Sequence, residues 1–211
     1  VRIGLVGSSQ ARETLGIPCR IAPAAASDGA GGHLLYGGWD AEGRAVADLY
    51  RVPSGGFGGA VEATPALPKR AGHALAPLPD GSWLIVGGTA GDGLLAPDVL
   101  RLRLAEGGTA IVAKAAPLPS PGALLYPASA GGPDGAYVFA GLGADGRGYR
   151  QVLRFEPEAG QWSSMLLARL PAGRADGVLA PLADRRMLLF AGWTRDLLGP
   201  RGLTDLWTWS L

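Results

Sequence analysis

A short apolar run that stops on a glycine pair occurs four times in this chain. The copies occupy residues 33–38, 81–88, 136–141 and 187–192. Measured between their final glycines, the steps are 50, 53 and 51 residues. A steady period of this size is the signature of a repeat architecture, in which each unit covers the apolar face of the next.

Two further features keep the same period. An arginine precedes the first apolar run of repeats one, two and four, at Arg20, Arg70 and Arg174, whereas repeat three has Pro121-Gly122-Ala123 at that place. A second run, led by Asp48, Asp98 or Asp205 and by Gln151 in repeat three, follows the glycine pair. The period therefore contains several ordered segments rather than one motif.

These segments are four to eight residues long, rich in β-branched and aromatic residues, and bounded by Gly, Pro, Asp or Ser, which is typical of strands. No apolar pattern of helical period continues for three turns. Four short strands per period predict an all-β chain built of antiparallel β-propeller blades. We expect a single domain over 1–211, with repeats at about 18–67, 68–119, 120–171 and 172–211. Residues 1–17 are expected to supply the closing fourth strand of the last blade.

The two positions of the glycine pair differ in what they tolerate. The first is Gly37, Gly87, Ala140 and Ala191, and the second is Gly38, Gly88, Gly141 and Gly192. The first position is therefore expected to need only a small side chain, and the second to need positive φ or the absence of a Cβ atom. On this basis Gly88→Val should unfold or severely destabilise the chain, whereas Gly87→Ala should cost little.

The residues resemble the kelch repeat. Its diglycine closes the second strand, and an aromatic residue on the third strand precedes a Trp on the fourth at the spacing of Phe155 and Trp162. Residues 70–73 are similar to the family's first-strand opening, and the resemblance covers essentially the whole chain. Repeats one and two have Gly59 and Thr109 at the place of the Trp, which puts their fourth strands in question.

The resemblance implies that Trp162 packs within a blade. It also implies more blades than four, commonly six or seven. A closed small ring and part of a larger propeller both remain open, and an incomplete ring would be expected to self-associate.

Composition excludes several classes of function. Nineteen basic and eighteen acidic residues give a net charge of +1, so neither nucleic acid nor an anionic membrane is an expected partner. No apolar run approaches the length of a membrane span, and residues 1–6 do not resemble a signal peptide. The single cysteine, Cys19, fits a reducing compartment. The compartment remains unknown, with the cytoplasm favoured.

Motifs for catalysis are weak. Residues 141–146 spell G-x-G-x-x-G, but a strand-like segment follows instead of a helix, so we interpret them as a hairpin loop. The only histidines, His33 and His73, lie on different predicted strands without Cys, Asp or Glu at ligand spacing, which favours structural roles. We therefore expect no metal, no cofactor and no enzymatic activity.

The loops between second and third strands form the candidate binding surface, because they gather on one rim of a propeller. Trp and Arg are enriched in binding hot spots, and these loops contain Trp39, Arg44, Arg147, Arg150, Trp193, Arg195 and Arg201. The expected function is a scaffold that binds a partner protein or an acidic peptide. The alternatives are an enzyme acting on a sugar or similar small molecule in the central channel, near Asp28 or Asp176, and a structural subunit of a larger complex.

Overall fold

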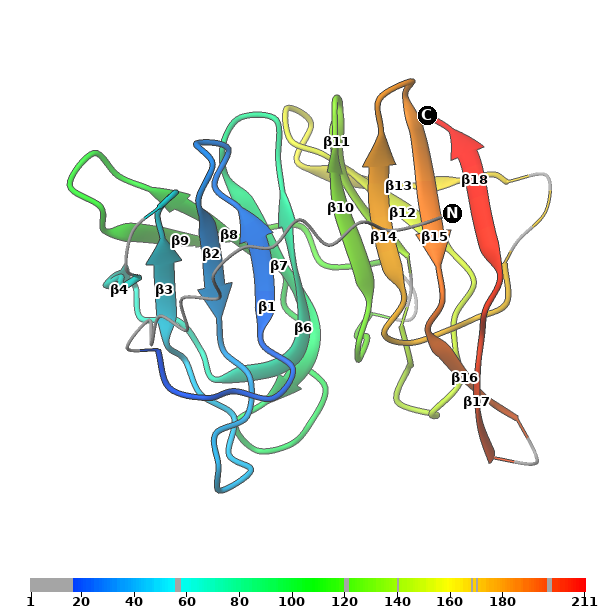
Figure 1. The fold of residues 1–211 in the computed structure, drawn as a ribbon, viewed down its shortest axis with the longest axis horizontal. Helices are drawn as coiled ribbons and strands as arrows, with labels where there is room; N and C mark the ends of the chain where they lie inside the picture. The colour runs from blue at the N-terminus through cyan, green and yellow to red at the C-terminus, as the bar shows by residue number, and fades with distance from the viewer. Residues whose placement is uncertain are drawn as a thin grey trace, which may run out of the picture.

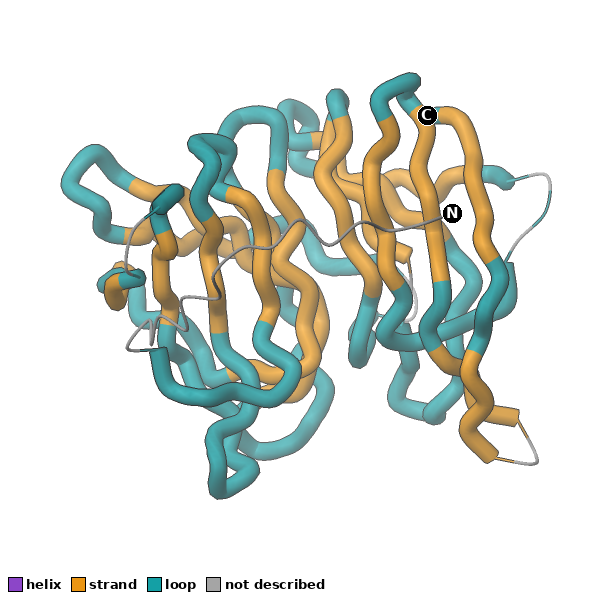
Figure 2. The backbone as a smooth tube through the Cα atoms, viewed as in Figure 1, coloured by secondary structure: helices purple, strands orange, loops and turns teal. Residues whose placement is uncertain are grey.

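The computed structural model describes residues 17–55, 58–119, 122–139, 141–167, 169, 171–196 and 199–211. Throughout these residues the secondary structure consists of strands, bridges and turns without a helix (Figure 2), which confirms the all-β prediction. The described part of the chain accordingly has no helix of the length and apolar character that crossing a bilayer requires.

Four mainly antiparallel sheets form the blades of a β-propeller (Figure 1). Blade 1 contains β1 (Ala24–Ser27), β2 (His33–Tyr36), β3 (Leu49–Val52) and β4 (Gly59–Ala60). Blade 2 contains β6 (Arg70–Pro77), β7 (Trp83–Ala90), β8 (Leu100–Leu104) and β9 (Ala110–Lys114), and β5 (Ala63–Thr64) pairs parallel to β9. Blade 3 contains β10 (Ala128–Gly132), β11 (Gly135–Phe139), β12 (Val152–Glu156) and β13 (Gln161–Met165). Blade 4 contains β14 (Val178–Leu182), β15 (Arg186–Phe190) and β18 (Leu206–Ser210).

The fourth strands vary between repeats. β4 has two residues, whereas β9 is a full strand of five, so Thr109 at the place of the Trp does not prevent a fourth strand in repeat two. In blade 4 a separate hairpin of β16 (Trp193–Asp196) and β17 (Gly199–Gly202) stands between β15 and β18. The expected closing strand at 1–17 lies outside the described residues, except for Ile17.

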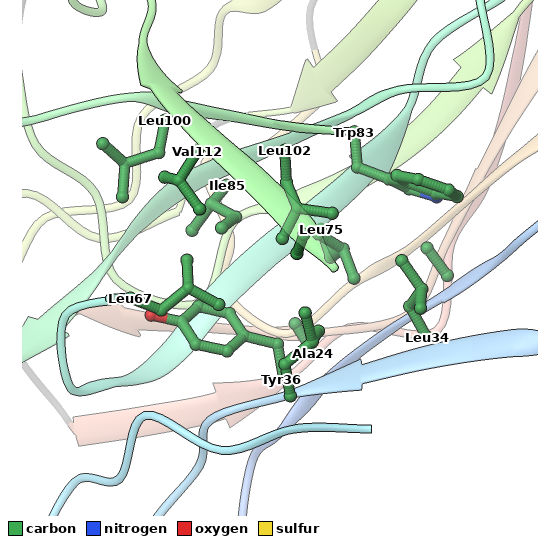
Figure 3. Close-up of a cluster of buried hydrophobic side chains, with 13 residues drawn as sticks. Ala24, Leu34, Tyr36, Leu67, Leu75, Trp83, Ile85, Leu100, Leu102 and Val112 are labelled. Atoms are coloured by element: carbon green, nitrogen blue, oxygen red, sulfur yellow. The ribbon is translucent and has the colours of Figure 1, made fainter. Parts of the chain in front are cut away.

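The strands alternate their side chains between the two faces of each sheet, so every blade offers one apolar face to the blade before it and one to the blade after it. Three buried clusters lie between successive blades. In the first, Leu34 and Tyr36 of blade 1 meet Leu75, Trp83 and Ile85 of blade 2 (Figure 3). The core of the molecule is therefore a series of interfaces between blades.

Backbone hydrogen bonds also join successive blades around the inner strands. Ala22, Tyr126 and Asp176 lie two residues before the first strands of their blades, Gly72 holds the equivalent place within β6, and all four have positive φ. The N–H of Gly72 donates to the carbonyl of Ala22 (3.2 Å), that of Tyr126 to Gly72 (2.8 Å), and that of Asp176 to Tyr126 (3.0 Å). Each blade thus donates to the one before it.

The repeated arginine and the repeated aspartate meet within blades 1, 2 and 4. Arg70 is buried, donates to the carbonyl oxygen of Gly87 (2.9 Å) and pairs with the Asp98 carboxylate at 2.8 Å. Arg174 makes the same contacts with Ala191 (2.9 Å) and Asp205 (2.7 Å), and Arg20 pairs with Asp48. The arginine therefore ties the first strand to the ends of the second and third.

The prediction for the first position of the glycine pair is wrong. A Cβ atom at Gly87 would overlap the carbonyl oxygen of Leu124 in blade 3, and one at Gly37 would overlap that of Arg70 in blade 2. At Gly88 a Cβ atom would lie 2.7 Å from the carbonyl oxygen of Ala71, within its own blade. The first glycine is thus required by the next blade and the second by its own first strand. Ala140 lies outside the described residues.

Candidate functional site

The loops that follow the second strands lie on one side of the molecule, the lower side in Figure 1, as the candidate binding surface required. Aspartates shape three of them. Asp40 accepts hydrogen bonds from the backbone N–H groups of Glu42 (3.1 Å) and Arg44 (2.8 Å), and Asp92 and Asp145 do the same for Leu94 and Arg147. These carboxylates accept hydrogen bonds from the backbone of their own loops and thereby stabilise turns. The loop at 141–148 is likewise a turn followed by β12, so the G-x-G-x-x-G segment is a hairpin loop.

Two of the predicted binding arginines are neutralised within their own loops. Arg44 pairs with Asp40 and Glu42, each at 2.9 Å, and Arg147 lies 3.8 Å from Asp145. The pKa of Asp40 is lowered, chiefly by the hydrogen bond from the backbone of Arg44 and further by that arginine's side chain. These loops therefore present little net positive charge.

Arg150 serves a different place. Its Nε donates to the carbonyl oxygen of Pro171 at 3.0 Å, which ties the start of blade 3's third strand to the segment that leads into blade 4. Blade 3 lacks both the arginine and the aspartate of the other repeats, and this hydrogen bond joins its third strand to the segment that follows the blade. We assign Arg150 to the framework.

Trp193, Arg195 and Arg201 lie on the β16–β17 hairpin, which projects from blade 4 (Figures 1 and 2). Arg195 stands opposite Pro200 and Arg201 opposite Thr194, so the two guanidinium groups leave opposite faces of the hairpin. Both arginines are exposed, and neither has an ion pair or hydrogen bond within the described residues. Trp193 shares the face of Arg195 and is half-buried.

Trp39 contacts a residue of another blade. Its ring meets Tyr126 of blade 3 edge to face, with centroids 6.2 Å apart. Tyr126 lies over Gly72, where a Cβ atom would come within 2.8 Å of its ring. Burial, with a contribution from the nearby charge of Asp176, raises the pKa of Tyr126. The structure therefore gives Trp39 a tyrosine neighbour from two blades away.

The first strands of all four blades surround a hollow of about 240 Å³. Most of its wall is small or apolar, including Ala25, Leu75 and Val178, and Ser129 and His73 are its polar members. His73 is buried, both its ring nitrogens lack partners among the described residues, and burial lowers its pKa to about 3. Its ring packs edge to face on Tyr36 at 4.6 Å, so the structural role predicted for it fits its contacts.

Neither of the carboxylates expected near the channel, Asp28 and Asp176, lines this hollow. Asp28 sits in the turn between β1 and β2 and pairs with Arg51 of β3 at 3.0 Å, while Asp176 is exposed at the opposite end of the first strand. Within the described residues no group of three His, Cys, Asp or Glu side chains could hold a metal ion.

A second series of ion pairs was missed by the sequence analysis. It joins the turn after the first strand to the third strand in blades 1 to 3, at Asp28–Arg51, Asp80–Arg101 and Asp134–Arg154. The signal was an arginine at equivalent places of the three third strands. Beside the last pair, Pro79, Glu156 and Pro157 help to line a hollow of about 430 Å³.

Comparison with solved structures supports the fold. No family model matches the chain, and no curated protein matches it. The solved structure of YjhT superposes with a TM-score of 0.71 over 90% of this chain and 68% of that one, at 14% sequence identity. The chain has a four-bladed β-propeller fold. At this identity the likeness concerns the fold alone.

Proposed function

We propose that this propeller is of the kelch type and acts as a scaffold that binds an acidic segment of a partner protein on the β16–β17 hairpin. The propeller fold is consistent with a binding scaffold. The kelch assignment is supported by Phe155 and Trp162, which are direct partners in the β12–β13 register and pack edge to face at 5.1 Å.

The observation that carries the binding proposal is the pair Arg195 and Arg201. They are exposed and have no partner within the described residues, whereas Arg44 and Arg147 are paired with carboxylates of their own loops. A guanidinium group without an internal partner keeps its donors for a ligand carboxylate, which it can hold in two-point geometry. Trp193 beside Arg195 adds an aromatic contact of the type enriched in hot spots.

The channel supports the alternative less well. Its wall is formed largely by alanine, proline, valine and leucine, and neither Asp28, which accepts a hydrogen bond within a turn, nor the exposed Asp176 lines it. Hydrolysis of a glycosidic bond ordinarily needs a pair of positioned carboxylates. We therefore favour binding at the rim over catalysis in the channel.

Fluorescence anisotropy with a labelled Glu-rich peptide tests the proposal. We expect binding that weakens as salt is raised, and a loss of about tenfold in affinity for the double variant Arg195→Ala/Arg201→Ala. A Gln-rich peptide of the same length should not bind.

Arg103→Ala is the matched control, because Arg103 is also exposed but pairs with Asp80 at the opposite end of the blade. Its affinity for the Glu-rich peptide should equal that of the unchanged chain. Equal losses for Arg103→Ala and the hairpin variant would show non-specific attraction, and would contradict the proposal.

A further inference from the structure

The outer face of blade 4 is apolar and uncovered within the described residues. Val178, Phe190 and Leu206 are 55%, 43% and 59% exposed. They lie in one row across the sheet, because Val178 pairs with Phe190 and Phe190 with Leu206. A contiguous apolar row of this kind marks an interaction surface.

In blades 1 to 3 the equivalent row of residues packs against the next blade. The counterparts of the blade 4 row are Ala24, Tyr36 and Leu49, then Ala74, Val86 and Val99, then Ala128, Phe139 and Val152. They hold the same places in strand register, except that Val99 lies one residue before β8, next to the last register pair of β7 and β8. All nine are buried, each set against the next blade. Blade 4 thus carries a blade-binding face without a blade on it.

Blade 1 carries the matching face. In blade 2 the surface that covers blade 1 includes Leu75, Ile85 and Leu100. Fifty residues earlier, blade 1 has Ala25, Leu35 and Tyr50 at these places. Ala25 is exposed, and Leu35 and Tyr50 are half-buried. Both halves of one blade-to-blade interface are therefore present in the same chain and are left open.

Unpaired backbone groups mark the same two edges. Each blade donates from the residue at the Gly72 place to the carbonyl of its predecessor, which leaves the N–H of Ala22 and the carbonyl of Asp176 without partners among the described residues. A second series runs the other way, from Gly38 to Arg70 (2.8 Å) and from Gly88 to Leu124 (2.7 Å). Among the residues that the structure describes, it leaves the N–H of Gly192 in blade 4 without an acceptor and the carbonyl of Arg20 in blade 1 without a donor.

We propose that blade 4 of one copy binds blade 1 of a second copy, head to tail, in the same geometry that joins successive blades within the chain. The two faces do not cover each other within one molecule, because both are exposed there. The contact would pair Ala22 with Asp176 and Gly192 with Arg20 across the interface. It stands independently of the function proposed for the hairpin.

Light scattering over a range of concentrations tests the proposal. We expect the unchanged chain to form a species of at least twice its mass of 21.5 kDa. Leu206→Arg on blade 4 and Leu35→Arg on blade 1 should each give monomers, because each variant lacks one of the two faces. Mixed in equal amounts, the variants should recover a dimer, because one intact pair of faces remains.

Leu94→Arg is the matched control, since Leu94 is 69% exposed in a loop of blade 2, and it should assemble normally. A monomeric unchanged chain at all concentrations would overturn the proposal, as would loss of assembly in Leu206→Arg but not in Leu35→Arg, which indicates pairing of like faces. If a variant does not melt cooperatively, amide hydrogen exchange of the unchanged chain tests the proposal instead. On dilution, the amides of β14, β15 and β18 should lose protection together with those of β1 to β3. Protection that does not change with protein concentration would contradict the pairing.

Discussion

At the first position of the glycine pair, the absence of a Cβ atom lets the backbone of the next blade approach closely. Comparing the repeats showed which position always lacks a side chain, but it could not show what stands opposite each one. Ala191 holds positive φ at the first position of blade 4, where no following blade lies within the described residues, whereas Gly87 faces the carbonyl of Leu124. The same sequence position thus has different requirements in different blades.

Gly87→Ala should therefore be severely destabilising. The added Cβ atom would force blade 3 away from blade 2 and would also hold alanine at φ of +69°, so we expect a loss of about 3 kcal/mol or more in the free energy of unfolding. Urea titration measures it.

Gly93→Ala separates the two causes, because Gly93 has φ of +82° with open space around it. It should lose only the backbone term, about 1 kcal/mol. Equal midpoint shifts for the two variants would show that the next blade yields easily, and would contradict the interpretation.

His73 should make the stability of the chain depend on pH. Burial lowers its pKa from 6.5 to about 3, so the unfolded chain takes up a proton at mildly acidic pH while the folded chain does not. Its full stability is present above pH 6.5 and is lost as pH falls toward 3, at up to about 1.4 kcal/mol per unit.

Unfolding measured between pH 7 and 5 isolates this effect, because carboxylates titrate lower. His73→Leu should flatten the profile, whereas His33→Gln, at an exposed histidine, should leave it unchanged. A slope that survives in His73→Leu would assign the effect to another group.

At the scale of one blade, the arginine and aspartate series act as a unit. The sequence showed both series and their joint absence from repeat three, where Gln151 and Pro121-Gly122-Ala123 stand. Their contact became visible only in the structure, since the residues are about thirty apart and meet because the first and third strands flank the second. The second series, from Asp28 to Asp134, was missed because turn aspartates usually serve the turn alone.

Arg174→Met should cost about 3 kcal/mol, because Arg174 is 1% exposed and its loss removes the donor to the Ala191 carbonyl and leaves the Asp205 carboxylate with only the indole N–H of Trp207. Hydrogen bonds from Arg174 lower the pKa of Asp205 to about 2, so this stabilisation is present above pH 3.8 and is lost as pH falls toward 2.

Thermal melts at neutral and acidic pH check the expectation. The difference between Arg174→Met and the unchanged chain should shrink at low pH. Arg103→Ala, at an exposed pair, should change stability by less than about 1 kcal/mol at either pH. A constant difference across pH would mean that packing, rather than the ion pair, is lost with Arg174.

For the whole molecule, the fifty-residue period was sufficient to predict blades, their strand order and their rim. It could not predict how the ring is completed, because that depends on the angle accumulated between packed sheets rather than on any local pattern. The loops after the second strands lie on the expected side. Which of their arginines are paired could not be predicted, because partners such as Asp40 and Asp145 come into contact only in the folded loops.

The division of the core into three interfaces determines where the molecule begins to unfold locally. Each of the three apolar clusters joins only two successive blades, so the cohesion of the core follows the rule of a short one-dimensional chain with nearest-neighbour coupling. The two middle blades are held from both sides, and each end blade from one. Local unfolding should therefore begin in blades 1 and 4 and proceed inward. An added neighbouring blade would stabilise most strongly the blade that it contacts.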